Sequence, residues 1–375
     1  MKAIINGKFI VGDSIIENKA LLFDEKIVGF VDSVGSDVEV IDADGCYVSA
    51  GFIDIHIHGS GGYDVMDATY EALESIAGAI VGYGTTSYLP TTMTMSRDDI
   101  HKALDNIKSY KPNKVEPCIL GVHMEGPFIN PIKTGAQDSR YIMDANIELI
   151  DEYMDIIRMI TIAPEVSKNL DFISYMSKNH PEIVLSIGHS NATYEESIKS
   201  FKCGISHATH MFNAMPSYHH REVGVIGAVL DDDSVSCDVI ADTIHTHHTT
   251  LSLLYRQKKS NLMLITDSMR AGCIKDGVYD LGGQAVYVKD GKATLPSGVL
   301  AGSVLKLNQA VSNMLKYSNA SIQEVIAMVT ELPAKKLGIN KGLLEIGYDT
   351  DIVIFDTDID IKLSIISGKV AYKKE

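Results

Sequence analysis

A small set of residues in this sequence has the types and spacing that a catalytic metal site needs. His56 and His58 lie two residues apart at the end of a predicted strand, so both imidazoles face one side and can reach one ion. Glu125 offers a carboxylate that can bind one metal ion or bridge two. His189 and His210, together with Glu125, form the His2Glu set of catalytic zinc sites, which leaves a position open for water.

Each of these residues also has a more ordinary interpretation. A lone His-x-His pair can simply form hydrogen bonds at a strand end, but the loop Gly59-Ser60-Gly61-Gly62 lets backbone approach a ligand and favours a site. Asp267 ends another predicted strand, where a carboxylate could take a proton from water and pass it to a leaving nitrogen. An aspartate there could equally cap a helix. The metal interpretation therefore depends on the residues coming together.

Two further features of the sequence could bind an anion. The guanidinium of Arg221 offers a forked contact, and the backbone N–H groups of Asn213 and Ala214 add donors. Most surface arginines are only solvated, so this interpretation depends on the fold.

The fold that would bring these residues together is predicted from the central part of the chain. Short apolar runs rich in β-branched residues alternate there with longer segments of helical period, as in βα units around a parallel sheet. The eight runs are 52–56, 86–90, 119–123, 159–163, 183–187, 205–209, 236–240 and 262–266. We therefore predict an α/β protein with a (β/α)8 TIM-like barrel, whose strands converge with their carboxyl ends on one face. The polar residues at or just past the ends of these runs are His56, His58, Glu125, Glu165, His189, His210, Asp242 and Asp267.

The two chain ends have a different residue pattern from the central part of the chain. Alternating apolar and polar residues with turn signals predict a small β-sandwich module from residues 1–49 and 341–375, which leaves 50–340 for the barrel. Residues 276–300 contain Gly-Gly and Asp-Gly turns and predict a hairpin inserted over the barrel mouth. Two helices follow, the second beginning with a capping box of Ser321 and Glu324.

Composition excludes some functions. A formal charge of −16 over 375 residues argues against a nucleic-acid partner, because such proteins carry a basic face. No apolar run reaches the roughly 18 residues of a membrane helix, and the N-terminus lacks a signal-peptide core. The five cysteines are scattered and odd in number, as expected for free thiols, so we predict a cytoplasmic protein without a membrane partner.

Taken together, the motifs resemble those of N-acetylglucosamine-6-phosphate deacetylases within the amidohydrolase superfamily. The matching segments are 51–59, 123–128, 188–190, 207–215, 241–242, 266–267 and 300–303, in the family's order over nearly the whole chain. The His-x-Glu-Gly-Pro-Phe and His-x-x-Asn-Ala-Met elements are fairly specific to these deacetylases, whereas His-x-His and the last aspartate occur throughout the superfamily.

The resemblance implies a metal-dependent enzyme that removes the acetyl group from N-acetylglucosamine 6-phosphate. It implies a first ion held by Glu125, His189 and His210, with Asp267 as general acid and base. Because both His56 and His58 are present, a second ion bridged by Glu125 is also expected. Zinc is the expected metal, with iron, manganese or cobalt as alternatives, and one or two ions per chain remain open.

The resemblance also implies a substrate site. The 6-phosphate would lie against Asn213, Ala214 and Arg221, with the arginine supplied by the neighbouring subunit of a homodimer. His245 would orient the acetyl carbonyl or a sugar hydroxyl. The rest of the pocket would be lined by Ala136, Gln137, Leu300, Ala301 and Gly302.

Three departures from the family pattern concern substrate fit rather than metal binding. Gln137 stands where many relatives have His, Thr243 where Gly is usual, and Val223 where Pro is common. A cyclic-amide hydrolase is a rival, but many of those enzymes bridge two metals with a lysine at the fourth strand, which here ends Ala163-Pro164-Glu165. Another N-acyl amidohydrolase, or a scaffold that has lost catalysis, are the remaining alternatives.

Overall fold

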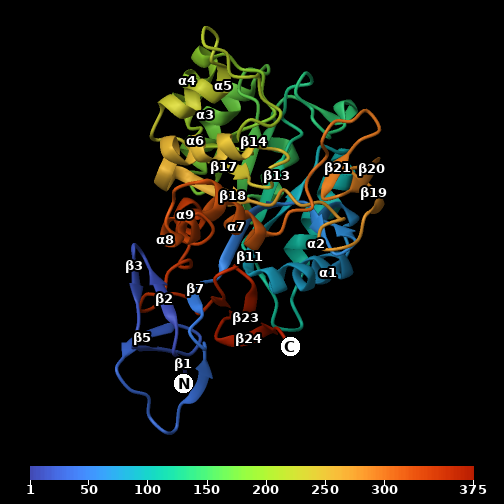
Figure 1. Cartoon of the computed structure of the whole chain (residues 1–375). Coiled ribbons are helices and arrows are strands. Elements are labelled where there is room, and N and C mark those ends of the chain that lie inside the picture. Colours follow the sequence, from blue (N-terminus) through green and yellow to red (C-terminus); the bar gives the residue numbers. More distant parts are fainter.

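The main body of the protein is a parallel β-barrel surrounded by helices, seen in a computed structural model that describes residues 1–375 (Figure 1). The strands, in barrel order, are β8 (Phe52–Ile57), β11 (Thr85–Thr92), β13 (Val122–Glu125), β14 (Ile157–Ile162), β15 (Val184–Ile187), β16 (His207–Ala208), β17 (Ser236–Ile240) and β18 (Leu262–Ile265). Each pairs in parallel with the next, and a parallel bridge between Ile57 and Ser268 returns the last strand to the first. The predicted (β/α)8 barrel is confirmed.

The barrel strands are buried along their length because helices cover them from outside. All residues of β8 and β11 are buried, as expected for parallel strands covered on both faces. The helices are α1 (Tyr70–Ile80), α2 (Arg97–Ser109), α3 (Asn169–Asn179), α4 (Tyr194–Cys203), α5 (Gly224–Asp231), α6 (His248–Lys258), α7 (Leu307–Tyr317), α8 (Ile322–Ala327) and α9 (Glu331–Leu337). The predicted capping box of Ser321 and Glu324 is present at the start of α8.

One βα unit departs from the predicted pattern. Between β13 and β14 the chain forms no α-helix but only the short 3-10 turns η3 (Ser139–Tyr141), η4 (Ile147–Leu149) and η5 (Asp151–Tyr153). Pro127, Pro131 and Gly135 interrupt the start of this segment, and each disfavours a continuous helix. The long loop that results lies along the barrel mouth and contributes Gly135, Ala136 and Gln137 to the cavity there.

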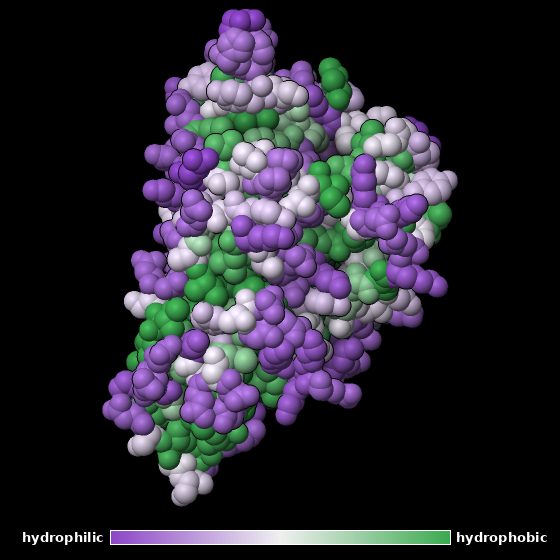
Figure 2. Space-filling model, in the orientation of Figure 1, coloured by the Kyte–Doolittle hydropathy of each residue, from purple (hydrophilic) through white to green (hydrophobic).

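The two chain ends form two β-sheets beside the barrel. One sheet has the order β5 (Ile27–Val31), β4 (Ala20–Phe23), β1 (Lys2–Ile5), β6 (Glu39–Asp42). The other has the order β24 (Lys369–Lys373), β23 (Ile361–Ile366), β22 (Ile352–Phe355), β7 (Tyr47–Ala50), β2 (Lys8–Val11), β3 (Ser14–Ile16). Side chains from both sheets, including Ile4, Phe23, Val48 and Ile354, share one apolar core separate from that of the barrel. The space-filling view shows apolar residues gathered at this end of the molecule (Figure 2).

The predicted insertion over the barrel mouth is a three-stranded antiparallel sheet. Its strands are β19 (Gly277–Leu281), β20 (Gln284–Lys289) and β21 (Lys292–Thr294). Leu281, Val286 and Val288 pack on Met93 and Met269, which follow barrel strands β11 and β18. Short strands β9 (Gly59–Ser60), β10 (Tyr63–Asp64) and β12 (Cys118–Ile119) complete the structure. None of the helices combines the length and apolar character needed to cross a bilayer.

Candidate metal centre and active site

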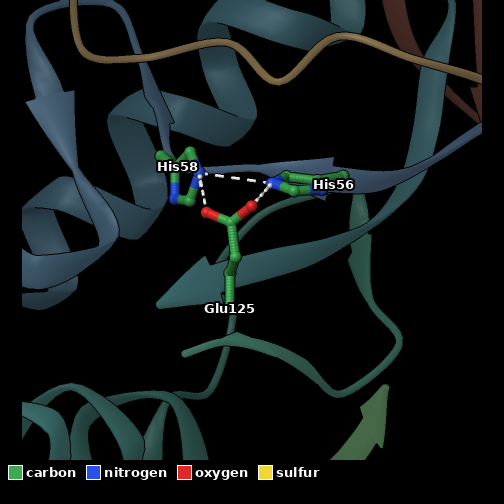
Figure 3. Close-up of side chains that lie close together, drawn as sticks. All are labelled: His56, His58 and Glu125. Atoms are coloured by element: carbon green, nitrogen blue, oxygen red, sulfur yellow. Dashed lines mark hydrogen bonds and ion pairs between the residues drawn. The ribbon is translucent and has the colours of Figure 1, made fainter. Parts of the chain in front are cut away.

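The metal-binding candidates meet at the carboxyl ends of the barrel strands. His56 lies on β8 with His58 just past it, and Glu125 is the last residue of β13. Figure 3 shows both imidazoles turned toward the Glu125 carboxylate. His189 and His210 contact the same carboxylate, and all five side chains are buried.

Three of the site residues share an uncommon backbone conformation. His189, His210 and Asp267 have φ angles of +46°, +32° and +48°, which residues other than glycine seldom adopt. Each stands two residues beyond the end of its strand, on β15, β16 and β18 respectively. Strained backbone repeated at equivalent positions is typical of a functional site, where the surrounding structure maintains it.

The first ligand group consists of Glu125, His189 and His210. Oε1 of Glu125 lies 2.8 Å from Nε2 of His210 and 3.0 Å from Nε2 of His189. The two imidazole nitrogens are 3.1 Å apart. Nδ1 of His189 donates to the Lys133 carbonyl at 2.8 Å, which leaves the Nε2 lone pair free to face the centre.

The second ligand group consists of His56, His58 and Glu125. Nε2 of His58 lies 3.2 Å from Oε2 of Glu125, and Nε2 of His56 lies 3.5 Å from Oε1 (Figure 3). Oδ1 of Asp267 is 3.3 Å from Nε2 of His58 and 3.5 Å from Nε2 of His56. Nδ1 of His58 donates to the Thr91 carbonyl, which again turns Nε2 toward the carboxylates.

Both groups fit a divalent cation. In each group two imidazole Nε2 atoms face one another across about 3 Å beside a carboxylate, an arrangement that a cation satisfies. Burial would raise the pKa of Glu125, but the neighbouring histidines lower that pKa well below its usual range and keep the carboxylate ionised. Burial likewise opposes charge on His210, yet the hydrogen bond to Glu125 raises the pKa of His210 to about 9. The centre therefore attracts positive charge.

Polar residues beneath the metal ligands support them and were not predicted from the sequence. Asp238 on β17 accepts a hydrogen bond from the backbone N–H of His210 and lies 2.9 Å from Nε2 of His207. Burial lowers the pKa of His123 to about 4, so its neutral ring donates from Nδ1 to the Ile55 carbonyl and accepts from Thr161 at Nε2. The sequence did carry one sign of these supporting residues, because each is a polar residue inside an apolar run that predicts a buried strand.

Two predicted strand-end residues do not join the centre. Glu165 accepts hydrogen bonds from Asn130, Ser190 and the Asn191 amide, so it ties loops together. Asp242 accepts from the backbone of Ile244 and His245 and pairs with Nδ1 of His245 at 2.6 Å. Both carboxylates therefore hold loops at the barrel mouth.

A cavity of about 240 Å³ lies above the two ligand groups. Its walls include the metal-ligand candidates His58, Glu125, His189 and His210, together with Asp267 and the predicted substrate residues Ala136, Gln137, Asn213, Ala214, His245, Leu300 and Gly302. Two predicted residues lie elsewhere. Ala301 is fully buried in the apolar cluster of the inserted sheet. Arg221 lines a separate surface groove, where its Nη1 atom contacts His220 at 2.7 Å.

Comparisons with known proteins show what this chain is similar to. Residues 47–373 match the family model described as the amidohydrolase family. The chain is 39% identical to an N-acetylglucosamine-6-phosphate deacetylase of Bacillus subtilis (strain 168), over 86% of this chain and 84% of that protein. It is 32% identical to an N-acetylgalactosamine-6-phosphate deacetylase of Escherichia coli O157:H7, over 89% and 90% of the two chains.

Solved structures agree with the sequence comparison. An N-acetylglucosamine-6-phosphate deacetylase from Pasteurella multocida superposes with a TM-score of 0.93 at 29% identity, covering all of both chains. The corresponding enzyme from Thermotoga maritima superposes with a TM-score of 0.90 at 31% identity, covering 99% of this chain and 100% of that one. The likeness includes the barrel and both terminal sheets.

Proposed function

The chain belongs to the amidohydrolase family, and we propose that it hydrolyses the acetamide of N-acetylglucosamine 6-phosphate to acetate and glucosamine 6-phosphate. The observation that carries this proposal is the buried histidine and glutamate cluster beside Asp267, at the floor of a cavity that would hold a small sugar. Relatives at 38% and 39% identity that bear this enzyme's name support the substrate.

Metal binding by this chain follows from the donor set. Glu125, His189 and His210 would hold one ion, and His56, His58 and Glu125 a second. When bound, such an ion polarises the acetyl carbonyl and acidifies the attacking water toward a pKa of ~7. Zinc suits nitrogen and oxygen donors in a buried site, and iron, manganese or cobalt would also fit.

Asp267 is the proton carrier in this proposal. Its carboxylate lines the cavity and lies 3.3 Å from Nε2 of His58, next to the second ligand group. It takes the proton of the attacking water as the new C–O bond forms. It then returns that proton to the sugar nitrogen as the C–N bond breaks, which gives the amine and acetic acid, and the acid loses the second proton of the water to become acetate.

Binding of the phosphate is favoured by a lysine or arginine, and the cavity of one chain has neither. No lysine or arginine is among the residues that line the cavity, whereas a phosphate ester carries between one and two negative charges at neutral pH. Asn213 and Ala214 can offer hydrogen bonds, and Arg221 of the same chain lies in a separate groove. A homodimer in which each Arg221 reaches the neighbouring cavity would supply a guanidinium for the phosphate.

The remaining parts of the proposal concern the sugar and the compartment. His245, held by Asp242, would orient the acetyl group or a hydroxyl, while Gln137 and Leu300 border the ring. All five cysteines are free, which is consistent with action in the reducing cytoplasm.

The deciding experiment is acetate release from N-acetylglucosamine 6-phosphate, compared with unphosphorylated N-acetylglucosamine and with N-acetylgalactosamine 6-phosphate. The galactosamine ester is included because one relative carries that name. Rapid turnover of the glucosamine ester, lost with a chelator and restored by zinc, is expected. Equal turnover of the unphosphorylated sugar would contradict the phosphate site, and no turnover of any of the three would redirect the search to other N-acyl compounds.

A further inference from the structure

The hydrogen bonds of Gln137 give it a role beyond bordering the sugar. We propose that Gln137 is a positioning residue, which holds the Glu125 carboxylate so that each oxygen serves a different metal ion. This inference rests on the metal centre of the proposed function. It does not depend on the identity of the sugar.

The orientation of the Gln137 side chain is fixed by its neighbours. The backbone N–H of Thr94 donates to Oε1 of Gln137 at 2.6 Å. Because only the carbonyl end of an amide can accept, the NH2 end must point the other way, and there it donates to Oε2 of Glu125 at 2.5 Å. Reversing the amide would set donor against donor in a side chain that is 6% exposed.

The two oxygens of Glu125 differ in their nearest ligands. Oε1 lies within 3.0 Å of His189 and His210 and 3.5 Å from Nε2 of His56, whereas Oε2 lies 3.2 Å from Nε2 of His58. The last torsion of a glutamate side chain is soft, so an unrestrained carboxylate could turn and place both oxygens on one ion. The donor from Gln137 on Oε2 opposes that rotation and preserves the bridge.

The restraint is effective because Gln137 is itself anchored from two directions. The Thr94 loop packs closely on the residue that follows Glu125, since a Cβ added to Gly126 would lie 2.1 Å from Oγ1 of Thr94. On the other side, Nε2 of Gln284 in β20 donates to the Ala136 carbonyl at 2.6 Å. The barrel and the inserted sheet thus both hold the loop that carries Gln137.

The test compares zinc binding by metal-stripped proteins. Gln137→Met keeps the length of the side chain and removes its hydrogen bonds, and Gln137→Asn keeps the amide but is one methylene too short to span both partners. Gln323→Met is the matched control, because the side chain of Gln323 on α8 only donates to the Asp13 carbonyl. Calorimetric titration with zinc and elemental analysis measure the affinity and number of ions, and circular dichroism checks folding.

We expect two zinc ions per chain in the natural protein and in Gln323→Met. In both Gln137 variants the first ion should bind nearly as before and the second about 10- to 100-fold more weakly, the range for loss of a group that orients a metal ligand. Unchanged affinity for both ions in a folded Gln137 variant would overturn the proposal, as would a single ion in the natural protein. A residue that only contacts the sugar would raise KM and leave zinc binding unaltered, and the titration needs no sugar.

Discussion

Replacing Asp267 with asparagine tests the proposed chemistry most directly. Asparagine has the same shape and tolerates the positive φ of +48° at this position, so the barrel should fold as before. It cannot accept and return a proton. Asp267 is 3.3 Å and 3.5 Å from the nearest imidazole nitrogens and is not a member of either three-residue ligand group, so metal content should be retained.

The size of the effect follows from the two steps that Asp267 serves. General acid–base catalysis contributes about 10²- to 10⁴-fold, and Asp267 acts both when water adds and when the amine leaves. We therefore expect kcat to fall by about 10³- to 10⁴-fold, or about 4 to 5.5 kcal/mol of transition-state stabilisation, with little change in KM.

The assay is acetate release under saturating zinc, with metal content measured on the same samples. A variant that keeps its metal and loses less than tenfold in kcat would refute the assignment of Asp267 as proton carrier. A variant that loses its metal would show instead that Asp267 is a ligand.

Three further predictions concern support, assembly and stability. Asp238→Asn should weaken zinc binding by about tenfold in calorimetry, because Asp238 fixes the His210 backbone; an unchanged affinity would remove its supporting role. Arg221→Ala and Asp267→Asn chains should each be nearly inactive, but mixing them in equal amounts should restore about a quarter of the natural activity, because half of the dimers then hold one complete site. If mixing restores nothing, Arg221 does not act across a dimer. Burial lowers the pKa of Lys336 to about 8, below its unfolded value of about 10.5. Between these pH values the unfolded chain therefore binds more protons than the folded chain. From pH 8 to 10.5 the free energy of unfolding of the natural protein should rise relative to that of Lys336→Met, by up to about 3 kcal/mol. Parallel denaturation curves for the two proteins across that range would contradict the buried charge.

The sequence predicted the barrel well because parallel strands have a simple signature. All eight apolar runs overlap or adjoin barrel strands, although the third strand begins at Val122 rather than at residue 119. The missing helix between β13 and β14 was harder to foresee, because a tertiary fold tolerates an irregular loop wherever other elements cover the strand.

The site was predicted in part, for a reason that lies in backbone geometry. His189, His210 and Asp267 turn into the centre through positive φ angles, whereas Glu165 and Asp242 stand two or three residues past their own strands and bind loops. Nothing in the residue types distinguishes these two outcomes. The contact between Gln137 and Glu125 was likewise not visible in the sequence, because an irregular loop brings them together.

The support beneath the ligands accounts for polar residues in a barrel interior that apolar side chains would otherwise fill. Ser186 and Thr209 are 2.5 Å apart, Thr209 and Thr161 are 2.7 Å apart, and Thr161 lies 2.7 Å from Nε2 of His123. Because Nδ1 of His123 must donate to the Ile55 carbonyl, Thr161 has to donate to Nε2, which sets the donor direction of the whole chain. Each member is satisfied only when the others keep their places. Because every member is satisfied, such a network is rigid, and it fixes the strands on which the metal ligands stand.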